Sequence, residues 1–229
     1  ITYEVDVDSD VCPSGTQASD ISNQSNVTGS NFPTVQTDEV AGAPVTPTLT
    51  PVSSLTLGNL VYKDVDKNGS FNGSDVGIDG VLLRLYADNG DGVLTGADGA
   101  SITTATTSGG GFYTFTGLCP GNYIVEVALS NFNSGGPLYD NTLMTALISS
   151  PVGGASDPDD NVNSDDNGDP VASFGVASQA ITLALGTEPT DDGDADNNTN
   201  LSLDFGFKAP TTVSIQPTLA LAEGTGGGT

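Results

Sequence analysis

The sequence predicts an all-β protein whose strands form a β-sandwich. Three observations predict this fold class. Helical periodicity is nearly absent from the 229 residues, short apolar or alternating runs recur, and turn signals such as Asn68-Gly69 and Asn89-Gly90 separate several of them. Many short strands divided by turns are typical of a β-sandwich.

The expected strands follow one another through the middle of the chain. Each is a short run with β-branched or aromatic residues, and Gly, Ser, Thr, Asn or Asp dominate the stretches between them. The strand segments are 57–62, 80–87, 101–107, 111–118, 122–129, 141–148, 179–185 and 200–207.

The two ends of the chain differ from this middle part. Residues 1–55 are rich in Ser, Thr, Asn and Pro and end in PVTPTLTPVSS, which predicts an extended segment. Residues 1–8 and 211–222 nevertheless have strand patterns. Such isolated strands either fold back on their own domain, add to a neighbour's sheet or fray. We therefore expect an N-terminal segment (1–55), a sandwich (56–208) and a C-terminal strand with a Gly-rich tail (209–229).

The charge is strongly acidic, with 29 acidic against four basic residues and a net charge of −25. Such a chain repels nucleic acid and anionic lipid, and it has no apolar run long enough to span a membrane, so we expect neither partner. Nearly all of the acids are Asp and only five are Glu. Short Asp side chains in loops favour metal binding or turn formation; a halophile-like acidic surface is the alternative.

The residue types that are missing limit the chemistry. The chain has no His and no Trp, which removes the commonest general base and transition-metal ligand. The Asp runs lie among Gly, Asn and Ser, which keeps them ionised and suits a cation better than acid catalysis. We expect no enzymatic activity. Two cysteines, Cys12 and Cys119, are too few for a zinc site; they either pair or are buried thiols.

The stretch DVDKNGSFNGSD, residues 64–75, has the oxygen spacing of an EF-hand calcium loop. That loop needs ligands at positions 1, 3, 5, 7 (a backbone carbonyl), 9 and 12, with Gly at position 6. The matching ligands are Asp64, Asp66, Asn68, Ser70 through its carbonyl, Asn72 and Asp75, and Gly69 is at position 6. Asp75 replaces the usual bidentate Glu, and the preceding segment is a strand, so the prediction is a calcium loop without EF-hand helices.

A second loop, DNGDGVLTGAD at 88–98, is a shortened version of the same pattern. Asp91, Gly92, Thr95 and Asp98 match positions 5, 6, 9 and 12, and Asp88 lies one residue closer than position 1. The alternative is a plain Asp-Gly turn.

A third acidic cluster, residues 156–169, contains six Asp and three Asn without a fixed spacing. Two carboxylates about 5 Å apart repel by roughly 0.8 kcal/mol in water, and by more in a partly dry loop. The cluster is therefore either cation-bound or without fixed structure, and the same holds for residues 190–200. The ligands expected in the third cluster are Asp157, Asp159, Asp165, Asp166 and Asn167. We expect structural Ca²⁺ at two or more sites in the chain.

Three stretches together resemble a known family. They are LGNLVYKDVDKNGSFNGSDVGIDGVLLRLY (57–86), GFYTFTGLCPGNYIVEV (111–127) and NLSLDFGF (200–207). These stretches are similar to the B-type repeat domain of the serine-aspartate-repeat surface adhesins, the SdrD B-like domain, a relative of the collagen-adhesin B-type fold. The resemblance covers about 56–208.

The resemblance implies an Ig-like or prealbumin-like β-sandwich that calcium makes rigid and that serves as a structural module on bacterial surfaces. It also implies that Asp64, Asp66, Asn68, Asn72 and Asp75 form the main calcium site. The 157–169 cluster resembles the Asp/Asn-rich insertion of long family members.

Two functions compete on this basis. The first is a secreted, calcium-stabilised subunit of an extracellular filament, assembling head-to-tail as a terminal strand adds to the next molecule's sheet. The second is an adhesin or stalk module of a larger cell-surface protein, with a host or cell-surface ligand. A carbohydrate-binding domain is a third alternative, weakened by the lack of Trp. The start at Ile1 is expected of a processed product or a fragment.

Six N-glycosylation motifs occur in the chain, and we expect a glycoprotein. A glycan would block metal contacts at Asn68 and Asn72, so the N-terminal pair is the expected target. The motifs begin at Asn23, Asn26, Asn68, Asn72, Asn197 and Asn200.

Overall fold

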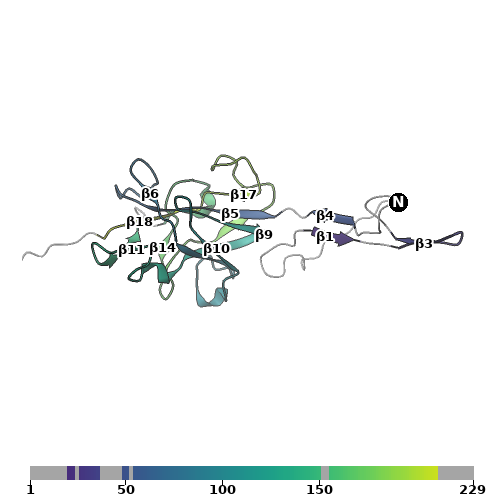
Figure 1. The fold of residues 1–229 in the computed structure, drawn as a ribbon, viewed down its shortest axis with the longest axis horizontal. Coiled ribbons are helices and arrows are strands. Elements are labelled where there is room, and N and C mark those ends of the chain that lie inside the picture. The colour runs from purple at the N-terminus through teal and green to yellow at the C-terminus, as the bar shows by residue number, and fades with distance from the viewer. Residues whose placement is uncertain (1–19, 24–25, 37–47, 52–53, 151–154, 211–229) are drawn as a thin grey trace, which may run out of the picture.

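The structure is a computed structural model, and it describes residues 20–23, 26–36, 48–51, 54–150 and 155–210. Within these residues the chain is all-β, with three short 3-10 helices, as the sequence predicts. The main body is a sandwich of two sheets (Figure 1). None of the described helices is both long and apolar enough to cross a membrane.

The first sheet is built around β5 (Leu55–Lys63), the longest strand. On one side β5 pairs antiparallel with β9 and β6, and on the other it pairs in parallel with β17 and β18, the last of which carries β13 at the edge. The bounds of these partners are β6 (Val76–Gly77), β9 (Phe112–Leu118), β13 (Ile148–Ser149), β17 (Thr199–Asn200) and β18 (Phe205–Lys208). The first and last strands of the sandwich therefore lie side by side.

The second sheet has the order β14-β15-β10-β7-β8, and β16 also pairs with β10. All of its pairs are antiparallel. Its strands are β7 (Leu82–Ala87), β8 (Thr103–Thr106), β10 (Gly121–Val127), β14 (Asp169–Pro170), β15 (Val176–Ala177) and β16 (Ile181–Leu183). The central strand, β10, is buried over Tyr123–Val127.

Alternation along the strands places the core between the two sheets. In β9, Tyr113, Phe115 and Leu118 are buried whereas Phe112, Thr114 and Thr116 are exposed. The buried side chains join Leu83, Val125, Phe205 and others in one cluster. A smaller cluster of Tyr86, Leu94, Ile124 and Ala177 covers the other face of β10. Both faces of β10 are therefore packed, which explains the apolar run Tyr123–Val125. The buried Glu126 of this strand forms an ion pair with Arg84.

The remaining elements are short. The 3-10 helices are η2 (Gly96–Asp98), η3 (Leu129–Phe132) and η4 (Pro158–Asp160), and β11 (Tyr139–Asp140) pairs with β12 (Thr145–Ala146). Before the sandwich, β1 (Asp20–Asn23) pairs with β4 (Thr48–Pro51), and β2 (Asn26–Gly29) pairs with β3 (Phe32–Gln36). These strand pairs lie where the sequence predicts an extended segment, and the β-branched residues of TLTP are compatible with a strand.

Two expected strands differ from those observed. Residues 141–148 are interrupted by a turn, because the Asp140 side chain accepts the N–H groups of Thr142 and Leu143 and Met144 has a φ of 51°. Residues 200–207 are divided into β17 and β18, and Asn200 accepts the N–H of Ser202 between them. The strands expected at 1–8 and 211–222 lie outside the described residues. The remaining expected strands overlap β5, β7, β8, β9, β10 and β16.

Gly206 in β18 illustrates how tightly the first sheet packs. A Cβ atom at this position would lie 2.3 Å from Ser150 Oγ and 2.7 Å from the Tyr62 hydroxyl, and both neighbours are fully buried. Only glycine fits without moving them.

We predict that Gly206→Ala lowers the free energy of unfolding by about 1–3 kcal/mol, because overpacking forces the buried neighbours to shift. Urea unfolding at fixed calcium measures the loss. The control is Gly96→Ala, where a Cβ meets no atom within 4 Å and a change within about 0.5 kcal/mol is expected. Equal losses in the two variants would contradict the packing account.

Candidate cation-binding loops

The first loop, residues 64–75, leaves the sandwich directly after β5. Asp64, Asp66 and Asp75 each offer a carboxylate oxygen, and these oxygens all lie within 4.8 Å of one another. Asp64 is buried and stays attached to the sheet, since its N–H donates to Phe207 O at 2.9 Å. Asp66 is exposed. The three carboxylates therefore converge at the end of the central strand, as the spacing predicts.

Backbone N–H groups wrap around the Asp64 carboxylate. Its Oδ1 accepts from Lys67 N at 2.6 Å and Asn68 N at 3.2 Å, and its Oδ2 accepts from Gly69 N at 2.9 Å. The turn depends on positive φ angles of 65° at Lys67 and 84° at Gly69. Glycine adopts such an angle without strain, which explains the Gly at position 6.

The Asp75 carboxylate closes the first loop. Its Oδ1 accepts from Val65 N at 2.7 Å and its Oδ2 accepts from Asn72 N at 2.9 Å. On the outer side, Asn68 Oδ1 accepts from Ser70 N at 2.8 Å, and Asn72 Nδ2 donates to Ser70 O at 3.0 Å. All six expected ligand residues therefore lie within one closed loop.

The second loop, residues 88–98, follows β7 of the other sheet and repeats this arrangement. Asp88 Oδ1 accepts from Gly92 N at 3.0 Å, as Asp64 accepts from Gly69. Asp98 Oδ1 accepts from Asn89 N at 3.0 Å and its Oδ2 accepts from Thr95 N at 2.7 Å. Asp91 accepts from Val93 N. Carboxylate oxygens of Asp88, Asp91 and Asp98 again lie within 4.8 Å of one another.

The two loops thus share one hydrogen-bond plan despite their different lengths. In each, the first Asp accepts the N–H of the glycine, and the last Asp accepts one N–H from the start and one from position 9 of the loop. Three carboxylates this close repel by roughly 0.9 kcal/mol per pair even in water. Ca²⁺ binds carboxylate and carbonyl oxygens, so a calcium ion suits both sets of donors.

The third cluster is divided by the fold. Asp157 caps η4 by accepting Asp159 N, and the Asp159 carboxylate accepts the N–H and hydroxyl of Thr182. Asp166 and Asn167 instead point inward and are buried. Among the residues that the structure describes, only the first two loops bring three acidic groups within 4.8 Å. The metal role of Asp157, Asp159, Asp165, Asp166 and Asn167 stays a prediction.

The buried part of the third cluster is tied to Asp204, which precedes β18. Asp204 N donates to Asn167 Oδ1, and the Asp204 carboxylate accepts from Leu60 N at 3.0 Å and Ser164 N at 2.6 Å. Asp166 accepts from Ser150 N at 2.9 Å and Gly168 N at 3.0 Å. These carboxylates join the third cluster to both β5 and β18. Asp204 lies in the stretch NLSLDFGF that carries the family resemblance, but the sequence predicts no metal-binding role for it.

Burial changes the protonation of these two acids. It raises the pKa of Asp204 to about 8 and that of Asp166 to about 6, although backbone N–H groups act in the opposite direction at both. Burial also raises the pKa of Asp165. Within the described part of the chain, three buried side-chain atoms have no hydrogen-bond partner: Asp165 Oδ1, Asn167 Nδ2 and Asp192 Oδ1.

The sequence left open whether the two cysteines pair or are buried thiols, and the structure answers this for one of them. Cys119, at the end of β9, is buried and disulfide-bonded. Cys12 lies outside the described residues.

The part of the chain that holds both loops is similar to a known domain family. The model of the SdrD B-like domain family matches residues 55–136, which confirms the predicted resemblance over this part of the expected 56–208. The match runs from β5 to the segment after η3 and contains the first and second loops. The third cluster lies beyond it.

Two curated relatives of this chain are serine-aspartate repeat-containing proteins. Serine-aspartate repeat-containing protein F of Staphylococcus epidermidis is 37% identical over 70 residues, and serine-aspartate repeat-containing protein D of Staphylococcus aureus (strain Newman) is 39% identical over 70 residues. Each match covers 31% of this chain but only 4% and 5% of the two relatives. The chain therefore corresponds to a small part of those proteins.

Among solved structures, a match is found to GBS52, the minor pilin of the Gram-positive pathogen Streptococcus agalactiae. The TM-score is 0.34 at 11% identity, over 80% of this chain and 67% of that one. A similarity at this level supports no conclusion about function.

The buried acids predict a pH dependence in calcium-free protein. Their folded-state pKa values lie above the ordinary 3.8, so their stabilising contribution is complete below about pH 4 and is lost as pH rises through about 6 and about 8. Asp204→Asn removes one hydrogen-bond acceptor and the ionisation together. In chelator we expect the Asp204→Asn protein to have a lower melting temperature than the wild type at pH 5. The difference in melting temperature should narrow by pH 9, because the wild type is then destabilised by its ionised Asp204. A constant gap from pH 5 to pH 9 in thermal melts would contradict the raised pKa.

Proposed function

We propose that the chain is a calcium-stabilised structural module of a bacterial cell surface. The observation that carries the proposal is the shared arrangement of three carboxylates in the first and second loops. One loop follows the central strand of the first sheet and the other follows β7 of the second sheet. A cation in each loop would hold together the connections that leave both sheets, and so would stiffen the whole sandwich.

The free energy that bound calcium can add to the folded state supports a structural role for the ion. An ion present at about a hundred times its dissociation constant stabilises the folded state by about 2.7 kcal/mol per site. Two such sites would supply a large share of the roughly 5–15 kcal/mol that is typical of a whole domain. We infer that the protein works outside the cell, where calcium reaches roughly millimolar concentration, and that it has no enzymatic activity.

We further propose that the module assembles into a filament. A terminal strand of one molecule would add to the sheet of the next, and such a head-to-tail contact propagates without closing. The strand-like sequences at both termini support this assembly. The net charge of −25 disfavours aggregation through the acidic faces and disfavours binding to nucleic acid.

A second function has support of its own. The matched stretch makes up only 4% to 5% of the relatives, so similar stretches also form a small part of much longer proteins. In that case the chain would be a stalk or adhesin module of a larger surface protein, and its partner would be a host or cell-surface ligand.

The calcium role is tested by Asp66→Asn. Asp66 is exposed, and its carboxylate accepts hydrogen bonds only within the loop, from Asn68. We expect a lower melting temperature in millimolar calcium and a change within about 0.5 kcal/mol in chelator. Asp64 is a poorer probe, because its carboxylate also binds three backbone N–H groups.

The matched control is Asp79→Asn, which is exposed and outside all of the acidic clusters, and asparagine keeps the Oδ1 that accepts from Gly110 N and Gly111 N. It should leave the calcium-dependent rise in melting temperature intact. Equal effects of Asp66→Asn with and without calcium would show that the first loop is not a cation site.

Electron microscopy separates the two functions. We expect the full chain to form filaments in millimolar calcium that dissociate or become flexible in chelator, because the sheets that accept the added strand depend on ordered loops. Dispersed particles in both conditions would reject the filament and favour the adhesin module.

A further inference from the structure

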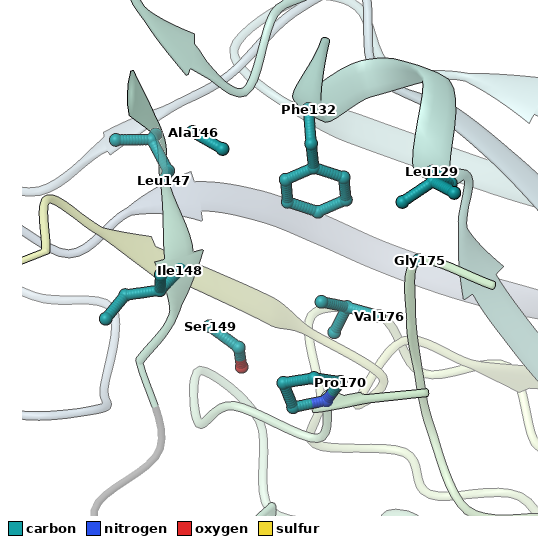
Figure 2. A pocket seen from close by; sticks show the side chains of 9 residues that line it. All are labelled: Leu129, Phe132, Ala146, Leu147, Ile148, Ser149, Pro170, Gly175 and Val176. Carbon is teal, nitrogen blue, oxygen red and sulfur yellow. The ribbon is translucent and has the colours of Figure 1, made fainter. Parts of the chain in front are cut away.

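An apolar groove lies at the open edge of the sandwich. It has a volume of about 220 Å³, larger than the roughly 150 Å³ apolar cavity that accommodates a benzene ring. Figure 2 shows Ile148 and Ser149 of β13 on one side, Pro170 and Val176 on the other, and Phe132 of η3 above them. No charged side chain lines the groove, although the chain as a whole is strongly acidic.

The groove lies between two edge strands. β13 is the last strand of the first sheet and β14 the last strand of the second, and each pairs with a single described strand. Ser149 Oγ donates to Gly168 O at 2.6 Å and joins the two edges at one end of the groove. On the rim, Leu129 is 52% exposed and Ile148 is 45% exposed. The sandwich is therefore open here, and apolar side chains face water.

Among the described residues, the backbone groups of Ser149 form the open part of the β13 edge, since Leu147 N already donates to Leu138 O at 2.9 Å. Ser150 N donates to Gly206 O at 3.0 Å, toward β18. Backbone groups of neighbouring residues in an antiparallel strand point to opposite sides, so the N–H and C=O of Ser149 face away from β18. An extended segment placed in the groove would find a backbone donor, a backbone acceptor and an apolar floor.

We propose that this groove binds residues 211–222 of a second copy of the chain; the inference rests on the filament function proposed above. In that segment Val213, Ile215, Pro217, Leu219 and Leu221 occupy alternate positions, which in a strand places them on one face. The segment from 209 to 222 has no charged residue, so it approaches an acidic body without repulsion. The N-terminal segment carries Glu4, Asp6 and Asp8 instead and is the poorer donor.

The topology favours a second copy over the same chain. Lys208 pairs with Ile148, so the chain leaves β18 at the end where it enters β13. To reach the outer side of β13, the same chain would have to cross the connection at residue 147. Connections that cross at one edge of a sheet are avoided in protein folds. A segment from a neighbouring molecule meets no such obstacle.

The test uses two full-length variants and their mixture. Ile215→Asp places a charge on the donor segment, and Leu129→Asp places one on the exposed rim of the groove, where folding is least affected. Each variant alone should stay monomeric in millimolar calcium under light scattering, whereas the wild type forms large species. Mixed at equal amounts, the two should form a dimer of twice the monomer mass, because one intact donor meets one intact groove and cannot propagate.

Leu185→Asp is the matched control, since Leu185 is 43% exposed and outside the groove; it should assemble like the wild type. A second measurement tests the groove directly, in case a variant fails to assemble because it does not fold. A labelled peptide of residues 209–222 should bind the Ile215→Asp protein, and adding Leu129→Asp to that protein should weaken binding at least about tenfold.

The outcomes distinguish the two proposals. Large species formed by Leu129→Asp, a mixture that stays monomeric, or peptide binding unaffected by Leu129→Asp would overturn the groove and leave the filament in place. A wild type that stays monomeric in calcium would overturn both the groove and the filament.

Discussion

Aspartate carboxylates that accept backbone N–H groups organise the loops of this protein. Asp64 and Asp75 close the first loop, Asp88 and Asp98 close the second, and Asp204 fixes the chain before β18. The short Asp side chain keeps its carboxylate close to its own backbone, so it can turn a loop around itself, whereas Glu reaches too far. This explains why the acids of the chain are nearly all Asp.

The same arrangement creates a charge that the protein does not balance itself. The chain has 29 acidic and four basic residues, and in its described part the one ion pair joins Arg84 to Glu126. Carboxylates that converge within 4.8 Å need another source of positive charge. We infer that a divalent cation supplies it, and that ions and loops together hold the strand ends in place. The apolar groove and the uncharged C-terminal segment are then the surfaces on which molecules can meet without repulsion.

The sequence predicted much of this structure where the signal is local. The spacing of Asp64, Asp66 and Asp75 depends on one turn, and alternation in residues 111–118 depends on one strand, so both could be found without the fold. Asp204 could not, because its partners Leu60 and Ser164 are distant in the sequence. The division of the third cluster could not be predicted either, because its partners are also distant in the sequence. Asp159 accepts the N–H of Thr182, whereas Asp166 points inward and accepts the N–H of Ser150. The turn after Asp140 was not predicted, because the apolar residues in 141–148 suggest a strand. The Asp140 side chain caps this turn by accepting the N–H of Thr142.

The most direct test is the number of calcium ions that the intact chain binds, measured by isothermal titration calorimetry after removal of bound metal. Our account predicts at least two ions per chain, bound tightly enough to be occupied at millimolar calcium and released by chelator. A chain that binds no calcium at this concentration would contradict the central claim, and the converging carboxylates would then serve only to shape their loops.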